Sequence, residues 1–287
     1  MNHTVKDAMT PEQASWRLST IPFVRVLGMR ALLAAAPGEA GRLVSALAPR
    51  PFLLDAEGAL ANGAIAAVID QAGSVAIWGR EGLSLPHATV SLSITFMDST
   101  SEEVVFDSRI VSLGHGLGHT LVEARTAGGR PIAQAMVNYA LGAYPGSSGG
   151  GGRPKDREGG LADNTDIPPL GGASFLEALG VRPPTDGAGL QMPFSLSLVG
   201  SRDPVALHGG AIAAGLISAA DLQAQDRGLR LSHLSVDYLR SGLAQETRFA
   251  ASVISESRKT LCVQVDALQE GGARRVATAT ARYFSSN

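Results

Sequence analysis

Cysteine is nearly absent from this sequence of 287 residues, which contains only Cys262. A single cysteine cannot form a disulfide within the chain. Cys262 lies in segment 261–265, where apolar and polar residues alternate, and this alternation predicts a strand. We therefore expect a buried strand cysteine, which could form a disulfide only with another chain.

Excess charge of either sign is also lacking. The sequence has 24 Lys+Arg and 26 Asp+Glu, a formal net charge of −2, which provides no strong field to attract nucleic acid or an anionic membrane. No segment reaches the roughly 18 consecutive apolar residues of a membrane-spanning helix. Residues 1–7 show no basic region followed by an apolar stretch. We therefore expect a cytoplasmic protein that binds neither nucleic acid nor membranes.

The length, by contrast, exceeds that of one ordinary domain, because roughly 150 residues per domain predicts two domains here. With 45% hydrophobic residues, the chain can bury a substantial core. Residues 144–172 are rich in Gly, Pro and Ser, which predicts a flexible linker. We therefore divide the chain into an N-terminal domain (1–143), a linker (144–172) and a C-terminal domain (173–287).

The two predicted domains repeat the same motifs in the same order. The matching pairs are Gly63–Ala67 with Gly210–Ala214, Leu92–Phe96 with Leu234–Tyr238, and Ile132–Tyr139 with Val276–Tyr283. Their separations of 147, 142 and 144 residues differ only as changes in loop length would make them. The repetition indicates an internal duplication.

Each copy predicts one alanine-rich helix followed by alternating strands. In the first copy we expect a helix at about 62–78 and strands at 89–96, 103–111, 119–125 and 131–139. One helix followed by an antiparallel sheet is typical of an α+β domain in which the sheet wraps around the helix.

The predicted central helix carries a lone carboxylate, Asp70, beside its apolar face. The apolar stripe runs through Ile65, Val68, Ile69, Ala72, Val75 and Ala76. The neighbours of Asp70 one and two turns away are small, so a second helix or a slender ligand can approach closely. A carboxylate beside such a groove is costly to desolvate unless it is paired or used; the alternative is that Asp70 faces water. In the second copy, Ile217 takes the place of Asp70 and Asp221 that of Ser74.

These residues resemble the PaaI-type branch of the hotdog thioesterase superfamily. Members carry a His-Gly-Gly turn, present here as His208-Gly-Gly, an acid nine residues after the His, and a Thr-rich strand. The resemblance covers about 15–143 and 173–285. It implies two tandem hotdog domains, each a central helix wrapped by an antiparallel sheet, that pair into a double hotdog.

By this resemblance, the Gly that opens the helix donates a backbone N–H to the thioester carbonyl, and the acid serves as nucleophile or general base. The two groups come from different hotdog units, which agrees with the rise of about 12 Å over eight helical residues. The complete composite site pairs Asp70 and Ser74 with His208, Gly209 and Gly210. We expect Ser74 to position Asp70, and the helix N-terminus to stabilise the oxyanion.

The other composite site joins Asn62 and Gly63 to Ile217 and lacks the acid at the family position. We expect it to be inactive unless Asp221 substitutes from one turn further along. Three basic residues are candidates for binding the phosphates of CoA, with solvated strand ends as the alternative; they are Arg240, Arg258 and Lys259.

No cofactor is expected beyond the CoA moiety of the substrate. His115 and His119 have a spacing compatible with a metal, but with no third ligand we expect a plain loop. The expected substrate is an acyl-CoA or an acyl-carrier thioester with an undetermined acyl group, and double hotdogs are able to associate further into homo-oligomers.

Two other functions fit the same fold. A hotdog hydratase adds water to an enoyl-CoA with an Asp and a His five residues later, a spacing found in Asp203 and His208. A non-catalytic hotdog that binds an acyl-CoA or a protein is the second, because one of the two acids is missing. Dependence on Asp70, on Asp203 or on neither separates the three functions.

Overall fold

The computed structural model describes residues 10–34, 41–81, 87–142, 161–162, 165–185 and 189–285. The first copy contains α1 (Pro11–Thr20), α2 (Pro22–Leu27), β1 (Arg30–Ala34), β2 (Arg42–Leu47), α3 (Asn62–Glu81), β3 (His87–Phe96), β4 (Val104–Gly114), β5 (Leu117–Thr126) and β6 (Pro131–Leu141). The second contains α4 (Phe175–Ala178), β7 (Leu190–Met192), β8 (Val199–Arg202), β9 (Val205–Leu207), α5 (Gly209–Ala224), β10 (Leu229–Tyr238), β11 (Thr247–Glu256), β12 (Thr260–Gln269) and β13 (Arg274–Ser285). Three short 3-10 turns are Pro51–Leu53, Leu196–Leu198 and Glu270–Gly272.

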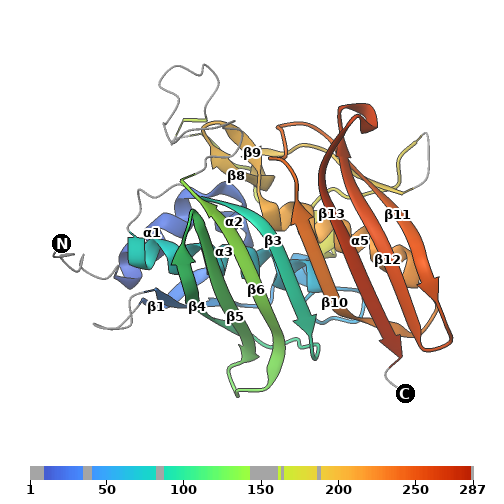
Figure 1. The fold of residues 1–287 in the computed structure, drawn as a ribbon, viewed down its shortest axis with the longest axis horizontal. Coiled ribbons are helices and arrows are strands. Elements are labelled where there is room, and N and C mark those ends of the chain that lie inside the picture. The colour runs from blue at the N-terminus through green and yellow to red at the C-terminus, as the bar shows by residue number, and fades with distance from the viewer. Residues whose placement is uncertain are drawn as a thin grey trace.

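One continuous sheet of 11 strands joins the two copies (Figure 1). Its order is β1-β2-β4-β5-β6-β3-β10-β13-β12-β11-β7. The copies meet where β3 pairs antiparallel with β10, with Ser93 opposite Ser235. The predicted α+β duplication is therefore confirmed, and each copy supplies one half of a single sheet.

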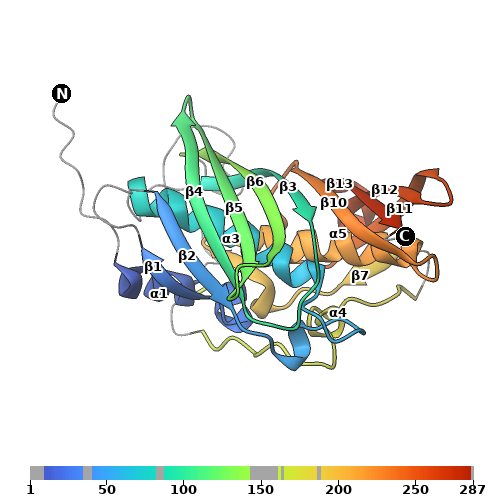
Figure 2. The same ribbon diagram turned by 90° about the horizontal axis from the view of Figure 1, so that it is seen from below.

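Both long helices lie on the same face of this sheet, one under each half (Figure 2). The two helices contact each other at glycine residues, which leave no room for a larger side chain. A Cβ on Gly210 would lie 2.6 Å from the Ala67 Cα, and one on Gly63 would lie 3.2 Å from the Ala214 Cβ. The two contacts are equivalent, because in each one the first glycine of one copy's motif meets the last alanine of the other copy's motif. The small-residue row therefore serves a helix–helix contact, the first of its two predicted uses.

The predicted apolar stripe of α3 is buried against the sheet. All of its residues have no exposed surface, namely Ile65, Val68, Ile69, Ala72, Val75 and Ala76. Helix α3 begins at the predicted residue and continues to Glu81, three residues beyond the prediction. Cys262 is buried in β12 as expected. None of the helices in the described part of the chain combines the length and the hydropathy needed to span a bilayer.

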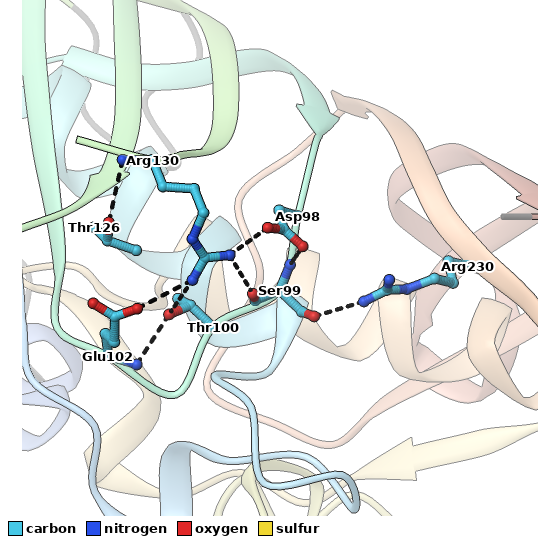
Figure 3. Close-up of polar contacts among 7 residues, drawn as sticks. All are labelled: Asp98, Ser99, Thr100, Glu102, Thr126, Arg130 and Arg230. Atoms are coloured by element: carbon cyan, nitrogen blue, oxygen red, sulfur yellow. Dashed lines mark hydrogen bonds and ion pairs between the residues drawn. The ribbon is translucent and has the colours of Figure 1, made fainter. Parts of the chain in front are cut away.

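A cluster of polar residues, which we call the polar clasp, joins the loop that follows β3 to the second copy (Figure 3). Its members are Asp98, Ser99, Glu102, Arg130 and Arg230. The Arg130 guanidinium pairs with Asp98 and lies 3.2 Å from Glu102. From the other copy, Arg230 donates a 2.6 Å hydrogen bond to the Ser99 hydroxyl. These groups are largely exposed, so each pair contributes at most about 1 kcal/mol. The clasp orients the loop beside the start of α3, where the Leu60 N–H donates to the Thr100 carbonyl.

Several residues at the C-terminal end of the predicted linker contact the folded part of the chain. Ile167 and Leu170 are buried, and the Leu161 N–H donates a 2.9 Å bond to the Arg202 carbonyl. Gly and Pro surround these residues in the sequence, which predicts a linker, and in the structure two of their apolar side chains are buried. Residues 144–160, 163 and 164 of the predicted linker lie outside the described residues.

Candidate active site

Asp70 in the middle of α3 meets the start of α5, as the composite-site prediction requires. Its side chain is almost fully buried, with 4% of the residue exposed. Thr89 on β3 donates a 2.7 Å hydrogen bond to Oδ1, and Oδ2 lies 3.4 Å from the His208 Nδ1 atom. A Cβ on Gly209 would approach Oδ2 to 2.9 Å. Glycine at the helix start therefore lets the carboxylate lie directly against the backbone of α5.

His208 caps α5 and is held in one orientation from both sides. Its Nδ1 atom accepts a 2.9 Å hydrogen bond from the Gly210 N–H, so the proton of the neutral ring belongs on Nε2. That atom lies 3.0 Å from the Gln71 Oε1 atom. Burial lowers the pKa of His208, and the negative charge of Asp70 opposes this only in part. The ring is therefore neutral at neutral pH, and it serves as a helix cap beside the carboxylate.

The Gly209 N–H is the free donor of this helix start. His208 takes the Gly210 N–H, and the next two amides, those of Ala211 and Ile212, donate to the His208 carbonyl. For the Gly209 N–H, the part of the chain that the structure describes offers no acceptor. On the other side, the Tyr238 hydroxyl donates a 3.0 Å bond to the Gly209 carbonyl and fixes the peptide. An unsatisfied amide at the positive end of α5 is a site for a developing negative charge.

Ser74 is in the site, but it does not bond Asp70. This differs from the expectation that Ser74 positions Asp70. Its hydroxyl lies 2.6 Å from the Nε2 atom of His87, the first residue of β3. The His87 ring packs at 5.3 Å from the rings of both Trp78 and Tyr139. Helical geometry explains the difference, because residues one turn apart lie about 6 Å apart along the axis and both point to the sheet. The residue that contacts the Asp70 side chain from the sheet is Thr89.

Three residues of this site were missed at the sequence level: Gln71, His87 and Thr89. Thr89 carried a signal, because a Thr-rich strand belongs to the family pattern. Gln71 and His87 carried none, because their partners come from other elements and depend on strand register and helix crossing. Gln71 is buried, its Oε1 atom contacts His208, and its Nε2 atom has no hydrogen-bond partner among the described residues.

The three predicted phosphate-binding residues do not lie together. Arg240 follows Tyr238 by two residues and so lies near the start of α5. Lys259 lies in the β11–β12 turn, where its carbonyl accepts from the Ser285 N–H, and Arg258 precedes it. That turn is beside Tyr283, which belongs to the other composite site. Of the three residues, only Arg240 is positioned near the Asp70 site.

The second composite site has the same backbone frame and different chemistry. Ile217, which replaces Asp70, is buried. Asp221, which replaces Ser74, accepts a 2.7 Å hydrogen bond from the Tyr283 hydroxyl. Desolvation raises the pKa of Asp221 to about 6, the Tyr283 bond opposes this rise, and the acids Asp55 and Glu57 add to it. Asp221 remains partly exposed at the surface, so solvent screens part of this effect.

Asp203 and His208 do not form the pair that a hydratase needs. Asp203 lies at the tip of the β8–β9 hairpin, where Arg202 faces Val205. His208 lies at the base, where its N–H donates to the Leu198 carbonyl. Five extended residues separate the two side chains by roughly 15 Å.

The histidines that were considered as metal ligands are also separated. His119 Nδ1 lies 2.6 Å from the Asn138 Oδ1 atom, and His115 is in the β4–β5 turn with a positive φ of 53°. Across the described ranges, no group of three or more His, Cys, Asp or Glu side chains is arranged to hold a metal ion.

Comparison with known families identifies both halves of the chain. Residues 57–133 match the model of the thioesterase superfamily, and residues 199–284 match that of the acyl-CoA thioesterase N-terminal domain. A search of curated proteins finds no match to the sequence.

Solved structures share the whole architecture at low sequence identity. A protein from Thermobifida fusca assigned as a thioesterase II superposes with a TM-score of 0.61 at 14% identity, over 93% of this chain and 100% of that one. The tesB protein of Mycobacterium avium subs paratuberculosis gives 0.55 at 13%, over 91% and 97%. An acyl-ACP thioesterase from Bacteroides thetaiotaomicron gives 0.56 at 12%, over 86% and 100%.

The fold and the composite site thus define a double-hotdog protein. The chain belongs to the hotdog thioesterase superfamily, with one thioesterase domain in each half, and is a thioesterase.

Proposed function

We propose that the chain is a PaaI-like acyl-CoA hydrolase with one working site, formed by Asp70 and the start of α5. The observation that carries this proposal is the buried Asp70 carboxylate against Gly209, whose N–H has no acceptor among the described residues. A carboxylate next to a free amide donor supplies the two groups that hydrolysis of a thioester requires.

In this mechanism the carbonyl oxygen of the thioester accepts the Gly209 N–H. The Asp70 carboxylate attacks the carbonyl carbon or activates a water that does so. The electron pair of the C=O bond moves onto the oxygen, where the amide and the positive end of α5 stabilise it. Collapse of this intermediate breaks the C–S bond and releases the thiolate. Thr89 holds Oδ1, so Oδ2 faces the start of α5.

Arg240 supports CoA as the carrier of the acyl group. It follows the strand that contacts Gly209, and its guanidinium donates to the Arg275 carbonyl at 3.0 Å, which leaves further N–H donors for a phosphate. The corresponding position beside the other composite site is the acid Asp98 of the polar clasp. Arg240 thus offers a positive charge to an anionic carrier at the Asp70 site.

The test is thiol release from a panel of short, medium, long-chain and aryl acyl-CoAs. Asp70→Asn keeps the shape of the side chain and removes its charge, so we expect turnover to fall by at least about 10³-fold. Asp221→Asn is the matched control in the other site and should retain wild-type turnover. Equal release by the wild type and Asp70→Asn would exclude Asp70 as the reacting group, and no release from any substrate would favour a binding role.

A further inference from the structure

Two hydrogen-bonded pairs lie in sequence along the wall of the Asp70 site. Asp70 and Ser74 are one turn apart on α3, and Thr89 and His87 are two residues apart on β3, so each pair of neighbours faces the same way. Thr89 bonds Asp70 at 2.7 Å, and His87 bonds Ser74 at 2.6 Å. The second contact has no assigned role in the proposed mechanism.

A hydroxyl within hydrogen-bonding distance of an imidazole nitrogen is an arrangement for proton transfer. Imidazole ordinarily titrates between pH 5 and 8, whereas a carboxylate is a weak base at neutral pH. Ser74 is buried, and His87 keeps partial contact with solvent. The pair therefore connects the interior of the site to a group that can exchange protons with water.

We propose that Ser74 and His87 form the proton relay of the composite site and act as the base for the water that completes hydrolysis. This inference rests on the proposed function and assigns Asp70 the role of nucleophile. Asp70 first displaces the thiolate and forms an acyl anhydride. A water oxygen then bonds to the acyl carbon, and the bond from that carbon to the Asp70 oxygen breaks.

The protons balance through the relay. The water proton moves to the Ser74 Oγ atom while the Ser74 proton moves to the Nε2 atom of His87. His87 then loses its proton to solvent, and the thiolate takes up a proton from solvent. The products are the free acid, the thiol and the regenerated Asp70 carboxylate. No oxidant or additional reactant is needed.

Aromatic side chains from two elements pack around the His87 ring. From β6, Tyr139 faces the ring; burial raises the pKa of Tyr139 well above its usual value, so it stays neutral. From α1, the Arg17 guanidinium lies 4.8 Å from the Trp78 ring, which in turn packs 5.3 Å from the His87 ring. The relay requires a neutral His87 ring, because only a neutral ring can accept the Ser74 proton.

The experiment measures kcat and KM against pH for the full-length protein, three relay variants and one control variant. His87→Asn and Ser74→Ala should each lower kcat by about 10²-fold, change KM little, and remove the acid limb of the kcat profile. The double variant should lose no more than either single one, because both residues serve one step. His119→Asn is the matched control, since His119 lies on β5 and bonds Asn138.

Three outcomes would overturn the relay: an acid limb that persists in His87→Asn, a kcat that does not change, or single losses that multiply in the double variant. His87→Gln and melting temperatures separate a folding defect from a chemical one. The underlying function is tested independently. If Asp70→Asn is active, the proposed function fails; if Asp70→Asn is inactive and His87→Asn is normal, the relay alone fails.

Discussion

The two composite sites share a backbone and differ in nearly every reacting side chain. Both are made by the start of one long helix against the middle of the other, and both have the close glycine contact. Asp70 and Thr89 in the first correspond to Ile217 and Leu231 in the second. His208, which caps α5, corresponds to Ala61 before α3. The fold therefore does not require the polar residues of the first site.

This difference shows what the polar residues are for. Ile217 and Leu231 are buried, and apolar residues at these positions cost no desolvation. Asp70 and His208 do cost desolvation, which hydrogen bonds to Thr89 and Gln71 offset. The fold tolerates apolar residues at the equivalent positions of the second site. The desolvation cost of Asp70 and His208 is therefore explained by a role in the reaction, not in folding.

The largest expected difference between the two sites comes from removing one backbone N–H, that of Gly209. Gly209→Pro deletes the proposed oxyanion donor, and proline is accepted at the first helical position after His208, whose φ of −68° and ψ of 136° suit a residue before proline. Gly209→Ala adds a similar Cβ next to Asp70 and keeps the N–H. We expect Gly209→Pro to turn over at least about 10²-fold more slowly than Gly209→Ala in a thiol-release assay.

Asn62→Pro is the counterpart in the other site, because Asn62 opens α3 as Gly209 opens α5. Its turnover should stay at the wild-type value. A loss as large as that of Gly209→Pro would mean that both sites work, or that the damage is structural.

A smaller effect sharpens the role of the strand. Thr89→Val keeps the shape of the side chain and removes the hydroxyl that donates to Asp70. We expect kcat to fall by roughly 10-fold, since a hydrogen bond to a charged group contributes about 1.5–3 kcal/mol. Thr95→Val on the same strand is the control, because Thr95 is exposed. Equal kinetics for the two variants would show that Asp70 is positioned without Thr89.

The smallest effect concerns stability at the second site. The pKa of Asp221 is raised to about 6, so the folded protein holds this proton at pH values where the unfolded chain has lost it. The free energy of unfolding should therefore decrease as the pH rises from about 4 to about 6. Asp221→Asn should remove this decrease, which is less than about 1 kcal/mol because the residue is partly exposed. Melting temperatures of both proteins across this range provide the measurement, and parallel curves would contradict the assignment.

The helices and strands were predicted well from the sequence because they depend on local patterns. Helix α3 and the four long strands of the first copy appear within a few residues of their expected bounds, since periodicity is set by each segment alone. The pairing of Asp70 with His208 and Gly209 came from the family resemblance and is present in the structure.

What the sequence missed depends on where elements end and how they cross. The strand predicted at 89–96 begins at His87, and those two added residues bring the imidazole to Ser74. Gln71 faces His208 only because α3 and α5 pack closely at Gly210 and Ala67. Neither contact follows from spacing along one segment.

The two copies that pair through β3 and β10 belong to one chain, and this changes how mutation acts on the enzyme. In a homodimer, one gene encodes both partners, so any substitution enters both active sites at once, and loss of an acid abolishes both. Here α3 and α5 are encoded separately and can diverge one codon at a time. The chain accordingly retains one acid and one His-Gly-Gly turn, which is the minimum that a single reactive centre requires. Active-site titration should count one centre per polypeptide.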